Sequence, residues 1–291
     1  MRGLNLNIIR WGKKIFKLTI WNKYTCSQPV VSLGNTPQSK KMPSNSKAVF
    51  SRPGRAIECT HLIVGPYTLG SLAIAPACLR KVIKIIEKLT PDDWTHSVLE
   101  YYRDGLSRFG DSWRYADILT VLAAISELIQ PSSYLEIGVR VGRSMSVVAA
   151  MCPTCDIVGF DLWMPEYAGI RNPGPEFVRS EINKFNFKGN LELIKGASHK
   201  TVPQYFERHP DMYFDLITID GDHSARGAEQ DLRTVIPRLK IGGIIVFDDI
   251  CHPAHPYLMD IWRKIVENNR KFITWKFTEL RDGIAFAIKK N

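Results

Sequence analysis

Short apolar runs that alternate with amphipathic stretches occupy the sequence from residue 133 onward. Five of these runs contain five to seven residues each, at 133–138, 155–161, 191–195, 214–220 and 243–248. Such alternation is typical of strand-helix-strand units, whose parallel strands are buried on both faces of one sheet. Two further runs, 272–277 and 283–289, are joined by a segment that ends in Asp282-Gly283, a turn dipeptide. We therefore predict an α/β fold: a seven-stranded, mostly parallel sheet with helices on both faces and an antiparallel last strand.

Residues 61–131 are predicted to form helices that pack on this sheet. Apolar residues recur three and four positions apart over 78–89, and Thr90-Pro91-Asp92-Asp93 then supplies an N-cap, a first-turn proline and two first-turn acids. We expect helices near 91–108 and 113–129, the second ending before Pro131. The chain then divides into a leader over 1–60, a helical segment over 61–131 and the sheet domain over 132–291.

The leader carries the whole net charge of the chain. Residues 1–60 contain eleven Lys and Arg residues and one acid, whereas residues 61–291 contain 28 bases and 28 acids. Because the body is neutral, the basic pI does not favour nucleic-acid binding there. We predict a disordered leader with a flexible linker at 32–55. Its first 21 residues alternate apolar and basic side chains, a pattern compatible with weak membrane-surface contact or an organelle presequence.

The cysteines and the hydropathy pattern favour a cytoplasmic protein. No stretch reaches the roughly 18 to 20 uncharged apolar residues that a membrane-spanning helix needs. Six scattered cysteines are too few for a disulfide scaffold, which favours a reducing compartment. Cys152 and Cys155 form a C-x-x-C pair, and we interpret them as ordinary structural thiols because no second ligand pair lies at zinc-finger spacing. Organelle targeting through the leader is the alternative.

The first strand of the sheet runs into Glu136-Ile-Gly138-Val-Arg-Val-Gly142-Arg-Ser144. Glycines at Gly138 and Gly142 let the backbone turn tightly and approach a ligand at the start of a helix. The spacing is E-x-G-x-x-x-G, whereas a nicotinamide fingerprint is G-x-G-x-x-G and presents its helix to a pyrophosphate. An acid before the first glycine repels phosphate and suits a ligand with a cationic amine. A purely structural turn is the other interpretation.

The next two strand ends carry residues suited to a nucleoside. Asp161 ends the second strand, 25 positions after Glu136, near the distance at which an acid binds the two hydroxyls of an adenosine ribose. The third strand ends in Gly196-Ala197-Ser198, where small side chains can lie against a flat purine and Ser198 can hydrogen-bond its edge. Asp161 could also simply cap the following helix.

Four carboxylates follow the fourth and fifth strands, in Asp220-Gly-Asp222-His223 and in Asp248-Asp249. Like charges a few ångströms apart raise one another's pKa, so these groups need protons or a cation between them. Carboxylate oxygens suit Mg²⁺ or Ca²⁺ rather than zinc. The alternative is that Asp222 caps the following helix and Asp249 is a solvated loop acid.

Taken together, residues 133–250 resemble the metal-dependent class I (Rossmann-like) O-methyltransferases, which use S-adenosylmethionine. The Glu136 to Ser144 run and LELIKGAS resemble catechol O-methyltransferase, and IDGDHS and FDDI resemble the macrocin-type sugar O-methyltransferases. The resemblance covers about 120 residues, and four motifs in the right order are more specific than any one.

The resemblance implies roles for individual residues. The methionine portion of the cofactor would lie by Glu136, Gly138, Gly142 and Ser144, the ribose by Asp161, the adenine by Ala197 and Ser198, and Asp220 would contact both cofactor and metal. Mg²⁺ or another divalent cation would be held by Asp220, Asp248 and Asp249, with Asp222 or His223 as catalytic base. Two residues depart from the catechol enzyme: His199 replaces Gln and Asp249 replaces Asn. The lysine base of that enzyme has no clear counterpart.

These features predict an enzyme that transfers a methyl group to a hydroxyl of a small molecule. The E-x-G-x-x-x-G spacing and the cluster of carboxylates both argue against a nicotinamide-dependent oxidoreductase. Four retained acids argue against a noncatalytic binding protein on the same fold, and the neutral body argues against a nucleic-acid substrate. The acceptor is open between sugar, phenol and peptide-like hydroxyls, and a homo-oligomer is compatible with the sequence.

Overall fold

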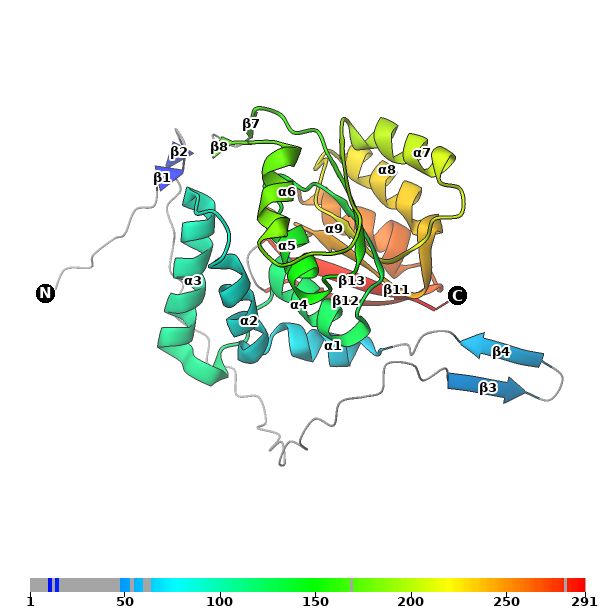
Figure 1. Ribbon diagram of the computed structural model, residues 1–291. Helices are drawn as coiled ribbons and strands as arrows, with labels where there is room; N and C mark the ends of the chain where they lie inside the picture. Colours follow the sequence, from blue (N-terminus) through cyan, green and yellow to red (C-terminus); the bar gives the residue numbers. More distant parts are fainter. Residues whose placement is uncertain are drawn as a thin grey trace, which may run out of the picture.

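The computed structural model describes residues 64–167, 170–279 and 282–290, together with the backbone of four short strands before them (Figure 1). These four strands pair as two antiparallel hairpins: β1 (Arg10–Trp11) with β2 (Lys14–Ile15), and β3 (Ala48–Arg52) with β4 (Arg55–Cys59). The rest of the predicted leader lies outside the described residues.

A seven-stranded sheet forms the centre of the protein, in the order β12-β13-β11-β10-β5-β6-β9. Its strands are β5 (Ser133–Ile137), β6 (Asp156–Asp161), β9 (Leu191–Lys195), β10 (Phe214–Ile219), β11 (Leu239–Asp248), β12 (Phe272–Phe277) and β13 (Ile284–Lys289). The neighbours from β11 to β9 are parallel, whereas β13 pairs antiparallel with both β11 and β12. The predicted seven strands and antiparallel last strand are confirmed.

Helices cover both faces of this sheet, because alternate strand residues point to opposite sides. Tyr134 and Val246 belong to one apolar cluster and their neighbours Leu135 and Ile245 to the other. The first cluster includes residues of α1 (Pro66–Ala73), α2 (Pro76–Ile86), α3 (Asp93–Phe109), α4 (Ile118–Ile129), α5 (Arg143–Met151) and α6 (Pro175–Asn183). The second includes residues of α7 (Ser198–Arg208), α8 (Ala225–Val235) and α9 (Tyr257–Trp262). In Figure 1, α7 and α8 accordingly lie across the sheet from α1 to α4. None of the helices among the described residues has the length and apolar character that crossing a membrane requires.

The predicted helical segment packs on the sheet, but its second helix begins later than expected. We expected a start near 113, whereas α4 begins at Ile118. The carboxylate of Asp117 accepts hydrogen bonds from the backbone of Leu119 and Thr120, and the backbone N–H of Asp117 donates one to the hydroxyl of Thr120, so this capping box fixes the first turn. The start predicted at 113 was therefore wrong by five residues.

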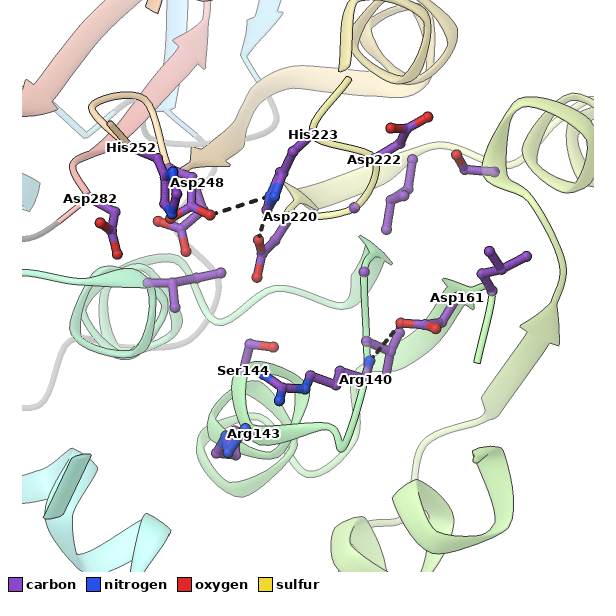
Figure 2. Close-up of a pocket in the computed structure, with 18 of the residues that line it drawn as sticks. Arg140, Arg143, Ser144, Asp161, Asp220, Asp222, His223, Asp248, His252 and Asp282 are labelled. Carbon is purple, nitrogen blue, oxygen red and sulfur yellow. Dashed lines mark hydrogen bonds and ion pairs between the residues drawn. The ribbon is translucent and has the colours of Figure 1, made fainter. Parts of the chain in front are cut away.

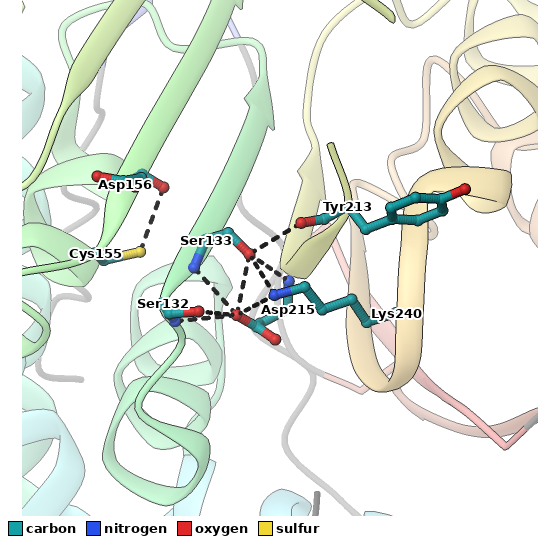
Figure 3. A network of polar contacts seen from close by, with 7 residues as sticks. All are labelled: Ser132, Ser133, Cys155, Asp156, Tyr213, Asp215 and Lys240. Atoms are coloured by element: carbon teal, nitrogen blue, oxygen red, sulfur yellow. Dashed lines mark hydrogen bonds and ion pairs between the residues drawn. The ribbon is translucent and has the colours of Figure 1, made fainter. Parts of the chain in front are cut away.

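A polar network ties together the amino ends of β5, β10 and β11, opposite the edge where ligands bind in such folds (Figure 3). One oxygen of Asp215 accepts hydrogen bonds from the backbone and hydroxyl groups of Ser132 and Ser133, at 2.7 to 3.1 Å. Lys240 donates to the same oxygen at 3.1 Å. Burial alone would raise the pKa of Asp215, but these donors outweigh burial and hold it below its usual value.

Candidate active site

A cavity of about 970 Å³ opens at the carboxyl ends of β5, β6, β10 and β11. The glycine loop between β5 and α5 and the strand ends carrying Asp161, Asp220 and Asp249 line one part of it, and helices α3 and α4 line another (Figure 2). Ligands of open α/β sheets bind at this edge, beyond the carboxyl ends of the strands. The cavity therefore brings together residues from segments far apart in the sequence.

The glycine loop requires glycine at both predicted positions. Gly138 has φ +94°, and a Cβ there would lie 1.9 Å from the backbone oxygen of Asp220. Gly142 has φ +79°, and a Cβ there would lie 2.7 Å from Val178. Gly138 lines the cavity, whereas Gly142 is not among the residues that line it. The first glycine thus lets the loop approach β10, and the second lets α5 approach α6.

Glu136 lies behind the cavity wall rather than on it. Its side chain is fully buried, accepts hydrogen bonds from the hydroxyls of Ser144 and Tyr134, and is absent from the cavity lining. Burial raises its pKa to about 8, although both hydroxyl donors oppose that shift. Ser144 itself lines the cavity. Glu136 is therefore joined to this site through its hydrogen bond with Ser144.

Asp161 holds the glycine loop in place from the end of β6. One carboxylate oxygen accepts a hydrogen bond from the backbone N–H of Arg140 at 2.7 Å, and the other accepts from the backbone of Trp163. The indole of Trp163 donates to the carbonyl of Arg140 at 2.9 Å. Both Arg140 (φ +53°) and Trp163 (φ +41°) have the left-handed backbone that side chains rarely adopt. Contacts with both the N–H and the carbonyl of Arg140 therefore fix a strained turn at the cavity.

The turn after β9 also reaches the cavity. Gly196, Ala197, Ser198 and His199 line it, and α7 begins at Ser198. The two residues predicted to meet a purine thus lie at the same cavity as Asp161. Behind them, burial raises the pKa of Asp231 in α8 to about 7.

Asp220, His223 and Asp249 bring their ionisable atoms close together in the cavity. Nε2 of His223 lies 3.4 Å from Asp220 and 3.3 Å from Asp249, and one ligand atom from each of the three residues lies within 4.8 Å of the others. This nitrogen is buried, and within the described part of the chain it makes no contact with hydrogen-bond geometry. The contact with Asp220 raises the pKa of His223, whereas burial opposes it. Asp249 has φ +60°, a strained backbone that directs its carboxylate into the group.

Asp248 lines the cavity beside this group without belonging to it. Burial raises the pKa of Asp248 well above its usual range, and the charges of Asp220 and Asp249 raise it further. The charges of two neighbouring carboxylates thus oppose the ionisation of Asp248, whereas the sequence predicted mutual repulsion among four.

Asp222 is directed away from the other acids. Its carboxylate accepts a hydrogen bond from the backbone of Ser224 at 2.8 Å, and a Cβ on Gly227 would lie 2.0 Å from its other oxygen. Figure 2 shows the Asp222 carboxylate pointing away from Asp220 and His223. The structure therefore places Asp222 against the start of α8, where it stabilises the loop that carries His223.

Several cavity residues were not identified from the sequence, among them Arg140 and Arg143, in the glycine motif itself, and Trp94, in α3. The prediction rested on the glycines and acids of that motif and did not include its arginines. Trp94 comes from the helical segment, where no local pattern indicates a ligand site.

Comparison with known proteins supports the interpretation of this cavity. The family model described as "Methyltransferase domain" matches residues 135–250, from β5 to the acids that follow β11. No curated protein matches the sequence. The crystal structure of the calicheamicin methyltransferase CalS11 is similar, with a TM-score of 0.50, 18% identity, and coverage of 73% of this chain and 91% of that one. The O-methyltransferase TomG from Streptomyces achromogenes has a TM-score of 0.49 and 17% identity, covering 70% of this chain and 92% of that one.

The similarity to CalS11 concerns the fold, and the family match falls on the segment that builds the cavity. Sheet order, glycine loop and strand-end residues agree with the resemblance found in the sequence. Residues 135–250 therefore match a methyltransferase domain, and they form the greater part of a sheet with the class I, Rossmann-like order of strands.

Proposed function

We propose that the protein transfers the methyl group of S-adenosylmethionine to a hydroxyl of a small molecule, with a divalent cation at the acids. One observation carries this proposal: Asp220, His223 and Asp249 meet in the same cavity that the glycine loop lines. A methyl donor held by that loop and a hydroxyl held by that group would face one another across a short distance.

The cofactor would lie along the carboxyl ends of β5, β6 and β9. Gly138 would give the backbone access to the ligand, Ser144 lies at the start of α5, and Asp161 would bind the ribose hydroxyls. Ala197 and Ser198 would contact the adenine. Glu136 would orient the hydroxyl of Ser144 from behind, since it does not reach the cavity.

The donor set fits a divalent cation. Oxygen ligands are those that Mg²⁺ prefers, and the mutual repulsion that raises the pKa of Asp248 would be relieved by a positive charge. The buried Nε2 of His223 faces two of the acids without a hydrogen-bond partner among the described residues. Asp220 and Asp249 would hold the ion, with Asp248 as the third carboxylate. When bound, such an ion would lower the pKa of a nearby hydroxyl and fix its direction.

His223 is the better of the two candidates for the base. The sulfonium methyl is already activated, so the enzyme must hold a deprotonated oxygen in line with the S–CH₃ bond. Nε2 of His223 lies at the acids and could accept the hydroxyl proton, whereas Asp222 is engaged with Ser224 at the start of α8. Asp222 would then act on the reaction by holding the His223 loop.

A methyl-transfer screen tests the proposal. Wild-type protein, Asp249→Ala and Asp104→Ala would be incubated with methyl-labelled S-adenosylmethionine and a panel of sugars and phenols, with MgCl₂ or with EDTA. We expect magnesium-dependent transfer by the wild type and by the exposed-site control Asp104→Ala, and none by Asp249→Ala. Calorimetry with S-adenosylhomocysteine and NAD runs in parallel. Binding of NAD in preference to S-adenosylhomocysteine would contradict the cofactor assignment, and equal turnover in EDTA would contradict the role of the cation.

A further inference from the structure

Two arginines line the cavity on the side away from the acids. Arg140 belongs to the glycine loop and Arg143 begins α5, and their guanidinium carbons lie 5.6 and 5.8 Å from the ring centroid of Trp94 in α3. Figure 2 shows both arginine side chains across the cavity from His223 and Asp248. We call the part of the cavity formed by Arg140, Arg143 and Trp94 the basic wall, and the part formed by Asp220, Asp248 and Asp249 the acidic wall. Asp161 lies next to the basic wall, at the backbone of Arg140.

Arg143 is a buried cation that the described residues neutralise only weakly. The residue is 9% exposed. Its polar contacts within the described part of the chain are both long, 3.4 Å to the hydroxyl of Thr95 and 3.5 Å to a carboxylate oxygen of Asp92. That oxygen already accepts a hydrogen bond from the backbone of Thr95 at 2.6 Å. A guanidinium group has five N–H donors, so most of its capacity is unused by these two contacts.

The pKa of Arg143 is consistent with the weak neutralisation that its two long contacts indicate. Burial lowers the pKa of Arg143 to about 10, against the charge of Asp92, and the neighbouring charge of Arg140 lowers it further. Because Arg143 is buried beside an open cavity and is repelled by Arg140, an anion at its guanidinium group would stabilise its charged form. The acids on the opposite wall would repel the same anion, so its position in the cavity is restricted to the basic wall.

We propose that Arg143, together with Arg140 and the indole of Trp94, binds a carboxylate group of a ligand in this cavity. The planar fork of a guanidinium group matches the two oxygens of a carboxylate, and Trp94 limits the orientations of both arginines. Two ligands could supply this group: the amino-acid tail of the cofactor, or a hydroxyl acceptor that carries a carboxylate. This inference rests on the proposed function, because that function supplies both the cofactor and the hydroxyl acceptor.

Two ligand pairs separate these sources. S-adenosylhomocysteine is compared with 5′-methylthioadenosine, which lacks the amino-acid tail, and 3,4-dihydroxybenzoate is compared with catechol on the protein saturated with S-adenosylhomocysteine. Each dissociation constant is measured by calorimetry for the wild type, Arg143→Gln, Arg143→Lys and Arg108→Gln. Arg108 lies on α3 with a side chain 67% exposed and pairs with Asp104, so its variant controls for the loss of an arginine. Thermal unfolding establishes that each variant is folded.

In one of the two pairs, we expect Arg143→Gln to weaken binding of the ligand that carries a carboxylate by about 10- to 100-fold. Binding of the ligand without a carboxylate should weaken less than twofold. Arg143→Lys, which keeps the charge without the fork, should fall between Gln and wild type. The loss of an arginine should not weaken binding of a ligand amine, so an effect on the nucleoside pair would identify the carboxylate of the tail. An equal effect on both members of each pair, or no effect, would overturn the inference. Wild-type protein that bound neither nucleoside would contradict the proposed function and, with it, the inference.

Discussion

Replacing Asp215 by alanine removes the acceptor that holds the amino ends of three central strands together. Its Oδ2 accepts hydrogen bonds from four groups of Ser132 and Ser133 and from Lys240, and its side chain is 11% exposed. One oxygen cannot make five bonds at full strength. Counting two charge-assisted bonds at about 1.5 to 3 kcal/mol each, and discounting for the partly exposed Lys240, gives about 3 kcal/mol.

A loss of that size should lower the midpoint of thermal unfolding by about 6 to 12 °C for a domain of this length. The assay is urea and thermal unfolding of the wild type, Asp215→Ala and Asp260→Ala. Asp260 pairs with Arg263 at 3.2 Å, but its side chain is 78% exposed, so its loss should change stability by less than about 0.5 kcal/mol. If Asp215→Ala were as stable as Asp260→Ala, the polar network would not contribute to the stability of the fold.

The difference between the wild type and Asp215→Ala should also depend on pH. Because the network holds the pKa of Asp215 below its usual value, the folded protein binds this proton less readily than the unfolded chain. The stabilisation is therefore complete above the unfolded pKa of about 3.9 and disappears as the pH falls through the lower folded value. Unfolding measured from pH 7 to pH 3 should show the two proteins converging at the acid end. A constant difference over that range would contradict the assigned pKa direction.

Three substitutions test the site itself. His223→Gln should lower kcat by about 10²- to 10⁴-fold with the affinity for S-adenosylhomocysteine unchanged, and unaltered kcat would exclude His223 as the base. Asp161→Ala should weaken the binding of S-adenosylhomocysteine by about 10- to 100-fold in calorimetry, because it removes both the proposed ribose contact and the support of the glycine loop; unweakened binding would contradict the cofactor placement. Gly138→Ala should lower the unfolding temperature more than Gly110→Ala, since both have positive φ but a Cβ on Gly110 meets no atom within 4 Å. Equal losses would show that the contact with β10 is unimportant.

The sheet was predictable because buried parallel strands are continuous apolar runs, and β5, β6, β9 and β10 lie within one residue of their predicted limits. Strand β11 begins at Leu239, four residues before the prediction. Its first residues include Lys240 and two glycines, which are not typical of a buried strand. Lys240 occurs in this strand because its side chain donates a hydrogen bond to Asp215. Helix α1 and the hairpin of β7 (Glu166–Tyr167) and β8 (Ile170–Arg171) were not predicted. The two strands of that hairpin have two residues each, too few to produce a period.

The site was predictable at the level of strand ends and not at the level of side-chain direction. Parallel strands bring their carboxyl ends to one edge, so the proximity of Asp220 and Asp249 followed from the order of the strands. The burial of Glu136 behind Ser144 and the turn of Asp222 toward α8 depend on packing between elements, which spacing does not encode. For the same reason, the basic wall made by Trp94 with Arg143 required the structure.

The left-handed backbone at Asp249 limits what can replace it. At φ +60° most side chains are strained, but asparagine tolerates this conformation about as well as aspartate. Asp249→Ala therefore changes the loop and the charge together, whereas Asp249→Asn changes the charge alone. The turn therefore accepts either a carboxylate or a neutral amide oxygen at this position. One substitution can change the negative charge beside Asp220 and His223 while the backbone of the turn stays the same.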